Sequence, residues 1–241
     1  MTAGRGEGYT AAMELRDLHP WDVSPREAIA IQRRLAAQVV REGEPRDVRR
    51  IAGVDIAIDK ARGRGIGAVV VLSYPELDVV EVAVEEAPLT FPYIPGLLSF
   101  REAPVLAAAF ARIAGPIDLL LVDGQGLAHP RRFGLACHLG LLLDLPAIGC
   151  AKSRLVGEHA TPGEAVGSRA DLIDSRGASG ELIGSVLRTR AGVKPLFVSL
   201  GHRIGLAQAE AWVLRCGGGY RLPQPTRLAD QAAGGRILSL A

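Results

Sequence analysis

Apolar residues recur at helical spacing shortly after a proline near the start of the chain. Ser24, Pro25 and Glu27 form the pattern of a helix N-terminus, in which a serine and a glutamate three residues later cap each other's backbone N–H groups. The apolar positions that follow fall on one side of a helix: Ile29, Ile31, Leu35, Ala36, Val39 and Val40. The pattern predicts a helix that begins at Pro25 and ends near Gly43 and Pro45.

Three β-rich stretches follow this helix. They cover residues 49–58, 66–73 and 79–84, and the turn-prone sequences Arg62-Gly63-Arg64-Gly65 and Tyr74-Pro75 separate them. Because short turns join antiparallel neighbours, we expect an antiparallel meander.

Beyond the meander, helical and strand patterns alternate. Residues 117–122 form a continuous apolar run, which is typical of a buried central strand. Further helices are predicted over 101–113, 134–143 and 206–216, and further strands over 147–150 and 196–199. Residues 158–178 show neither pattern and are predicted to be rich in loops. The sequence therefore predicts an α/β fold with a mixed central sheet flanked by helices.

Composition limits the class of protein. The length of 241 residues, 48% of them apolar, fits one α/β domain, and the net charge of only +2 means that a nucleic acid would have to meet a local basic patch. Cys137, Cys150 and Cys216 are too few and too widely spaced for a disulfide framework or a CxxC zinc site, so we expect reduced thiols. Residues 1–20 lack an apolar signal-peptide core and no run is long enough to span a membrane, so we expect a soluble, cytoplasmic protein.

Two aspartates and a glutamate are candidate metal ligands. Asp55 lies inside an apolar strand, where an unpaired carboxylate is costly to bury, and Asp123 ends the central apolar run, at a strand end where α/β proteins often place their sites. Taken alone, each aspartate is as easily a capping or salt-bridged residue. Glu102 lies near a predicted helix start, where an acidic residue also simply favours the helix dipole. If the three carboxylates converge, they form a site for Mg²⁺ or Mn²⁺, which prefer oxygen ligands.

Several long strings of the sequence resemble the endonuclease V family. The strings are Phe91 to Glu102, Asp123 to Gly126, His129 to Arg132 and Ile148 to Ser153, with shorter likenesses at Gly53 to Asp55, Val198 to His202 and Pro225 to Asp230. The likeness covers about residues 22–232. Residues 1–21 are then expected to be a loose N-terminal extension, and residues 233–241 a C-terminal tail. The resemblance implies a ribonuclease H-like fold.

The resemblance also implies a reaction and its catalytic residues. Asp55 and Asp123 would bind Mg²⁺, with Mn²⁺ as a substitute, and Glu102 would assist them. His202 would lie beside the metal site, and Lys152 near the scissile phosphate. The implied reaction is hydrolysis of the second phosphodiester bond 3′ to a deaminated base such as hypoxanthine. It leaves 3′-hydroxyl and 5′-phosphate ends and initiates DNA repair.

A short proline-flanked segment resembles the family's wedge, which inserts into the strand beside a flipped base. Tyr93 is its aromatic residue, and Pro92, Ile94 and Pro95 surround it. A ring held between two prolines is stiff and can replace the base stacking that is lost when a nucleotide flips out. Without the surrounding string, this tyrosine would be read as an ordinary residue of a proline-rich turn.

Other matched positions resemble the family's base pocket. They are Gly96, Leu98, Gly124, Gly126 and Leu155. A glycine has no Cβ, so backbone groups there can approach a base closely and read its edge. His129, Arg131 and Arg132 precede a predicted helix N-terminus, where they could meet phosphates, although a solvated basic turn fits the same pattern. His138 is expected to be packed rather than to bind a ligand.

Three alternatives to a deoxyinosine-specific nuclease share some of these features. An inosine-specific ribonuclease fits the same base pocket, and the compact chain with its short C-terminal tail favours DNA over RNA only moderately. Another ribonuclease H-like nuclease, such as the nuclease half of an excision-repair subunit, would lack the wedge string. A module that binds inosine without cutting would not need Asp55, Glu102 and Asp123 together. We expect a monomer that acts on nucleic acid and not at a membrane.

Overall fold

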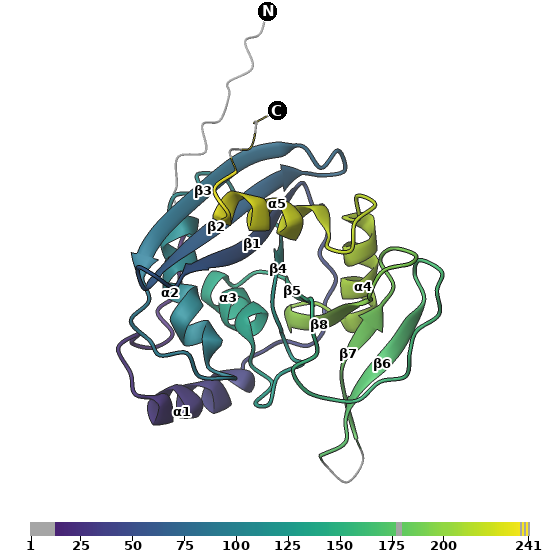
Figure 1. Ribbon diagram of the computed structural model, residues 1–241, viewed down its shortest axis with the longest axis horizontal. Helices are drawn as coiled ribbons and strands as arrows, with labels where there is room; N and C mark the ends of the chain where they lie inside the picture. The colour runs from purple at the N-terminus through teal and green to yellow at the C-terminus, as the bar shows by residue number, and fades with distance from the viewer. Residues whose placement is uncertain (1–12, 177–179, 237, 239, 241) are drawn as a thin grey trace, which may run out of the picture.

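The computed structural model describes residues 13–176, 180–236, 238 and 240, which form a mixed eight-stranded sheet with helices on both faces (Figure 1). The strand order is β3-β2-β1-β4-β5-β8-β7-β6. The strands are β1 (Arg50–Asp59), β2 (Arg64–Ser73), β3 (Val79–Pro88), β4 (Leu119–Val122), β5 (Ala147–Ala151), β6 (Arg169–Asp174), β7 (Glu181–Leu187) and β8 (Leu196–His202). The helices are α1 (Pro25–Ala36), α2 (Leu98–Phe110), α3 (Leu135–Leu143), α4 (Leu206–Arg215) and α5 (Gln224–Ala233). The predicted α/β class is confirmed.

The pairing of the strands brings the ends of β1 and β4 together. The strands β1 to β3 form the predicted antiparallel meander, whereas β1, β4 and β5 run parallel to one another. Val54 of β1 lies opposite Val122 of β4. The residues that follow them, Asp55 and Asp123, are therefore neighbours, and the Asp123 N–H donates to the Val54 carbonyl at 3.1 Å.

Helices cover opposite faces of the sheet because successive strand residues point to opposite sides. Ala52 and Val54 of β1 pack with α2 and α3 on one face. On the other face α5 packs against β2, through Ala68, Val70 and Leu72. Asp55 has the same parity in β1 as Gly53, so its side chain points to the α5 face.

The helix α5 lies directly on β1 at Gly53. A Cβ at this position would lie 2.0 Å from the Pro225 carbonyl carbon and 2.1 Å from its oxygen, much closer than atoms can approach without bonding. Only glycine allows the two backbones to approach this closely. Gly53 therefore fixes the height of α5 above the sheet.

The first helix is shorter than predicted. The capping box at Ser24 and Glu27 is present, but α1 ends at Ala36 rather than near Gly43 and Pro45. The next residues instead pair with the chain that follows β8: Arg203 N–H donates to the Val40 carbonyl at 2.8 Å. The β-branched valines continue the apolar spacing of the helix, and tertiary hydrogen bonds pull them out of it.

Elements absent from the prediction lie in the C-terminal half. The section 158–178, predicted to be rich in loops, contains β6, and both β7 and α5 were missed. The strand β6 is a short edge strand of six residues, three of them charged, and the adjacent Leu172 and Ile173 break the alternation of a half-buried strand. The first turn of α5 contains Pro225 next to Pro223, and prolines so close together indicate a loop in sequence reasoning.

The predicted loose N-terminal extension is wrong for residues 13–21, and residues 1–12 lie outside the described part of the chain. Met13, Leu15 and Leu18 pack against the core beside α2 and α3. His19 is buried, and its Nε2 lies 2.7 Å from Nε2 of His138. Apolar residues spaced irregularly along a charged segment gave no periodic signal for this contact.

The cysteines agree with the prediction from composition. Cys137, Cys150 and Cys216 are buried free thiols, as expected. None of the helices in the described part of the chain combines the length and apolar character needed to cross a bilayer.

Replacing Gly53 with alanine is expected to destabilise the protein by at least 2–3 kcal/mol, because the new methyl group forces α5 away from β1. Urea denaturation followed by fluorescence measures this loss. Gly234→Ala at the end of α5 is the control, since a Cβ there would lie 3.3 Å from its nearest neighbour. Equal stability of the two variants would contradict the packing argument.

Candidate active site

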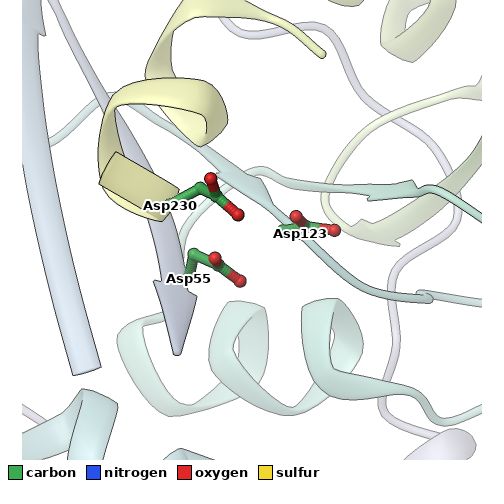
Figure 2. A group of neighbouring side chains, drawn as sticks. All are labelled: Asp55, Asp123 and Asp230. Carbon is green, nitrogen blue, oxygen red and sulfur yellow. The ribbon is translucent and has the colours of Figure 1, made fainter. Parts of the chain in front are cut away.

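Three aspartates from distant parts of the sequence meet at one edge of the sheet (Figure 2). Asp55 comes from β1, Asp123 follows β4 and Asp230 comes from α5. One carboxylate oxygen of each lies within 4.8 Å of the others. Converging carboxylate oxygens at this separation suit a hard divalent cation. The predicted convergence of Asp55 and Asp123 is therefore present, and Asp230 completes the group.

The role of Asp230 was missed in the sequence. It lies in one of the strings that carry the resemblance, but no helix was predicted there and no role was given to it. A helix over residues 224–233 places Asp230 on the face of the sheet to which Asp55 points. A predicted α5 would have been the signal that identifies this third aspartate.

Lys152 lies directly beside the aspartates, as the resemblance implied. Its Nζ is 2.6 Å from Oδ2 of Asp123 and 3.2 Å from Oδ1 of Asp230. Burial lowers the pKa of Lys152, but the hydrogen bond and charge of Asp123 and Asp230 outweigh burial and raise it overall. One ammonium cannot neutralise three carboxylates, so the group keeps a net negative charge that a divalent cation would balance.

Two carboxyl groups of the site hold protons near neutral pH. Burial, followed by the charge of Asp123, raises the pKa of Asp55 to about 7. Burial also raises the pKa of Glu102 to about 7, against the opposing effect of Arg101 and with a contribution from Asp123. These carboxyls therefore exchange protons with water in the physiological range, which is typical of functional sites.

Glu102 lies further into its helix than the sequence suggested. It is the fifth residue of α2, and the first turn of that helix contains no acidic residue. A simple interaction with the helix dipole, which falls off within the first turn, does not explain its position. Glu102 instead lines the cavity that also exposes Asp123.

A cavity of about 390 Å³ opens beside Asp123. Its lining brings together most of the residues that the resemblance assigned to substrate and catalysis: Tyr93, Pro95, Gly96, Leu98, Glu102, Asp123, Gly124, His129, Lys152 and Leu155. Leu135, which was not predicted, adds apolar wall, and Gln125, Ser153 and Arg154 add polar groups. The size and the mixture of apolar walls with few polar groups are typical of a small-ligand pocket.

Gly126 does not line this cavity, and its predicted role in the base pocket is not supported by its position. A Cβ on Gly126 would lie 2.2 Å from the Leu200 carbonyl oxygen. Its N–H donates to Oγ of Ser199 at 2.9 Å. Gly126 therefore lets the loop after Asp123 lie close against β8.

The carbonyl of Gly96 fixes one wall of the cavity. It accepts hydrogen bonds from Nε2 of Gln32 at 3.0 Å, Nε2 of His129 at 3.0 Å and a guanidinium N–H of Arg131 at 2.5 Å. Gly96 has a φ of +81°, a conformation that favours glycine. Gln32 was not predicted as part of the site; its only signal was a polar residue among the apolar positions of α1.

His129 acts here as a neutral hydrogen-bond donor. Its Nε2 donates to Gly96, and its Nδ1 accepts from the Arg131 N–H at 3.2 Å. Burial and the charge of Arg131 lower the pKa of His129 to about 4. A neutral imidazole lining a cavity can orient a ligand without adding charge.

The two arginines that follow His129 are bound within the protein. Arg131 donates to Oε1 of Gln32 at 2.5 Å, and Arg132 pairs with Asp174 at 2.6 Å and with Glu181 at 2.7 Å. Their guanidinium groups thus have partners within the protein, which agrees with the alternative of a structural basic turn; their contact with phosphates stays a prediction. His138 is fully buried, as predicted.

His202 does not lie at the site, which corrects its predicted role. In β8, which runs antiparallel to β5, His202 pairs with Ala147 at the start of β5, whereas Lys152 follows the end of β5. The imidazole Nδ1 accepts from the Val40 N–H at 3.2 Å, and Nε2 lies 3.4 Å from Asp144. His202 is thus a buried structural residue beside the start of β5, at the opposite end of this strand from Lys152.

Tyr93 projects from the loop before α2. Its side chain is 70% exposed, next to a cavity that it helps to line. Pro92 and Pro95 are exposed, and Ile94 is half-buried in a cluster with Phe91 and Phe100. An aromatic ring exposed to this extent has no packing role of its own, so it is available to contact a ligand.

Known proteins share this sequence and fold. The family model for endonuclease V matches residues 33–231. The chain belongs to the endonuclease V family. Endonuclease V of Gloeobacter violaceus is 52% identical over 215 residues, which cover 88% of this chain and 86% of the relative. Endonuclease V of Dehalococcoides mccartyi is 51% identical over 221 residues, which cover 92% of this chain and 97% of the relative.

Solved endonuclease V structures have the same fold. The enzyme from Streptomyces avermitilis superposes with a TM-score of 0.84 at 41% identity, covering 93% of this chain and 97% of that one. The Ciona intestinalis enzyme, solved with a 24mer DNA containing an inosine followed by a ribo-adenosine, superposes with a TM-score of 0.73 at 27% identity, covering 87% and 96%. The family resemblance found in the sequence is confirmed, and the chain is a nuclease.

Replacing Asp55 with asparagine is expected to stabilise the metal-free endonuclease more at pH 8 than at pH 5. A raised pKa means that the folded state holds its proton more tightly than the unfolded chain. The stability gained in this way is present below the ordinary pKa of about 4 and is lost as the pH rises through about 7. The amide removes this loss, a gain on the order of 3–4 kcal/mol at pH 8 and of roughly 1 kcal/mol at pH 5. Thermal unfolding in chelator at both pH values measures it.

The exposed Asp22→Asn variant is the control for loss of a surface carboxylate. A stability gain for Asp55→Asn that is the same at both pH values would show that charge at Asp55 is not the cause.

Proposed function

We propose that this chain is a metal-dependent endonuclease that recognises hypoxanthine in DNA and hydrolyses the second phosphodiester bond 3′ to it. Hydrolysis leaves 3′-hydroxyl and 5′-phosphate ends and begins the repair of a deaminated base. The observation that carries this proposal is the cavity that opens directly beside Asp123, since it joins a base-sized space to the group of three aspartates. The protein acts as a monomer on nucleic acid in the cytoplasm.

The residues present fit a divalent cation. Asp55, Asp123 and Asp230 offer one oxygen each within 4.8 Å, and their net negative charge with Lys152 calls for a cation. We propose Mg²⁺, with Mn²⁺ as a substitute, because both prefer oxygen ligands. Such a cation supplies neutralisation of charge on a phosphoryl oxygen and activation of water.

Lys152 and Glu102 provide the remaining charges at the reacting bond. The Lys152 ammonium, held at Asp123, is placed to bind a non-bridging oxygen of the scissile phosphate and to stabilise the charge that develops on it. Glu102, whose pKa lies at about 7, is placed to accept a proton from water at its carboxylate and to release it afterwards. Neither role requires a change in the fold.

The cavity can hold one flipped purine. Leu98, Leu135 and Leu155 provide apolar walls, whereas Gly96 and Gly124 bring backbone close to the space. Backbone groups without a neighbouring Cβ can read the O6 and N1–H edge of hypoxanthine by hydrogen bonding. The hydrogen bonds to the Gly96 carbonyl hold this wall of the cavity in place before a base arrives. Less conformational entropy is therefore lost when the base binds.

Tyr93 would occupy the space that a flipped nucleotide leaves in the strand. Its exposed ring lies at the mouth of the cavity, and Pro92 and Pro95 flank it in the sequence. Inserting a stiff aromatic ring between bases offsets the stacking energy lost on flipping, which amounts to a few kcal/mol.

Replacing Asp123 with alanine is expected to abolish nicking of a deoxyinosine oligonucleotide while binding is retained, since the pocket walls remain. Asp230→Ala is expected to have the same effect because it also removes a cation ligand. Nicking is measured with Mg²⁺, with Mn²⁺ and with chelator, on matched strands that contain deoxyinosine, inosine or guanine. Loss of cutting in chelator, and cutting of deoxyinosine in preference to the other two, is the expected pattern.

The control is His202→Asn, at a residue far from the aspartates. The asparagine keeps an acceptor for the Val40 N–H, so nicking should be unchanged. Normal cleavage by Asp123→Ala would refute the metal assignment. If strands that contain inosine were cut as fast as strands that contain deoxyinosine, the chain would be an inosine nuclease without preference for DNA.

Replacing Tyr93 with alanine is expected to weaken lesion discrimination more than the chemistry. Loss of one stacking ring reduces cutting at deoxyinosine by roughly tenfold, on the scale of one stacked base. Cutting of undamaged strand should change little. The measurement is the ratio of the two rates, with Tyr93→Phe as the control that keeps the ring. A ratio equal to that of the unchanged protein would rule out the wedge role.

A further inference from the structure

An exposed tyrosine and a half-buried arginine outside the cavity form a pair beside the aspartates. Tyr220 follows the three glycines 217–219 and is 49% exposed. The guanidinium carbon of Arg227 lies 4.3 Å from the centre of its ring. Arg227 makes no ion pair with any carboxylate in the described part of the chain, and its buried Nε has no hydrogen-bond partner there. Its charge is therefore not neutralised by the protein.

The pair lies next to the group of three aspartates. Arg227 and Asp230 are three residues apart in α5, so their side chains are neighbours on one face of the helix. Arg221, the residue after Tyr220, donates to the Lys152 carbonyl and to the Pro195 carbonyl at 2.8 Å. The Arg221 guanidinium thus ties the Tyr220 segment both to the segment that carries Lys152 and to Pro195.

The pair and the cavity lie on opposite faces of the sheet. The cavity is lined by residues of α2 and by the loop before α3, which cover one face, whereas α5 covers the other. Asp123 lies between them, at the sheet edge. A nucleic-acid strand with one base in the cavity and a phosphate at Asp123 must therefore cross this edge and continue toward α5.

We propose that Tyr220 and Arg227 form a stacking platform for a base of the substrate strand on the 3′ side of the cut. An aromatic ring with an unneutralised guanidinium behind it stacks on any base, because every base presents a π face. The platform holds the strand beyond the scissile bond while the cavity holds the lesion. This inference rests on the proposed function, which sets the direction of the strand.

The experiment measures binding by fluorescence anisotropy, with Ca²⁺ in place of Mg²⁺, of two deoxyinosine strands. One strand continues well past the scissile bond on its 3′ side, and the other ends one nucleotide beyond that bond. Tyr220→Ala is expected to weaken binding of the long strand by roughly tenfold, within the range that stacking of one base supplies. Binding of the short strand is expected to stay unchanged.

Tyr220→Phe is the matched control, and it should bind both strands like the unchanged protein because the ring remains. Thermal unfolding of both variants checks that the exposed position leaves the fold intact. Equal weakening for the long and short strands would mean that Tyr220 only supports the neighbouring segment. No weakening for either strand would also overturn the platform.

Failure of the proposed function gives a different result. It would be seen in the unchanged protein, as equal binding of strands with deoxyinosine and with guanine. The dependence of the Tyr220 effect on strand length is then read on the guanine strands, where a loss confined to the long strand supports the platform and any other pattern refutes it.

Discussion

Repulsion between carboxylates is the constraint that organises this molecule. Three aspartates meet within 4.8 Å at a partly buried edge, an arrangement that raises the free energy of the folded chain unless a cation is present. Lys152 relieves part of the repulsion by pairing with two of them. The raised pKa of Asp55 is the residual effect of burial and of the unneutralised charge. The protein keeps a group of residues that costs stability, as functional sites often do.

Rigid packing around the site supports this strained group. The carbonyl of Gly96 receives hydrogen bonds from α1 and from the loop that contains His129, so two separate elements hold the cavity wall. Arg131 and Arg132 serve the same purpose through Gln32 and Asp174. Arginines that would be read as phosphate contacts in a sequence are thus structural ties in the fold.

The sequence predicted the N-terminal two-thirds of the fold well, because β1 to β3, α2, α3 and β5 each carry a clear period or apolar run. It also identified Asp55, Asp123, Glu102 and Lys152. It failed where tertiary contacts decide: Val39 and Val40 continue a helical pattern but lie beyond the end of α1, and β6 is too short and too irregular in its alternation to be recognised.

The errors at the site have a common physical origin. A polar residue in a string that resembles the family reaches the site only if strand direction and helix placement bring it there. A short sequence string does not reveal either of these. His202 lies in a matching string, yet the antiparallel course of β8 carries it away from the aspartates. Asp230 lies in another, and only the unpredicted helix α5 brings it to them.

The close contact between Gly53 and Pro225 makes the group of three aspartates depend on the seating of α5. One of the three aspartates arrives on α5, a helix that is held to β1 by backbone proximity rather than by a covalent link. Without α5 seated on the sheet, the group would consist of Asp55 and Asp123 alone. The completeness of the group therefore depends on a backbone contact that lies several residues away from it along α5.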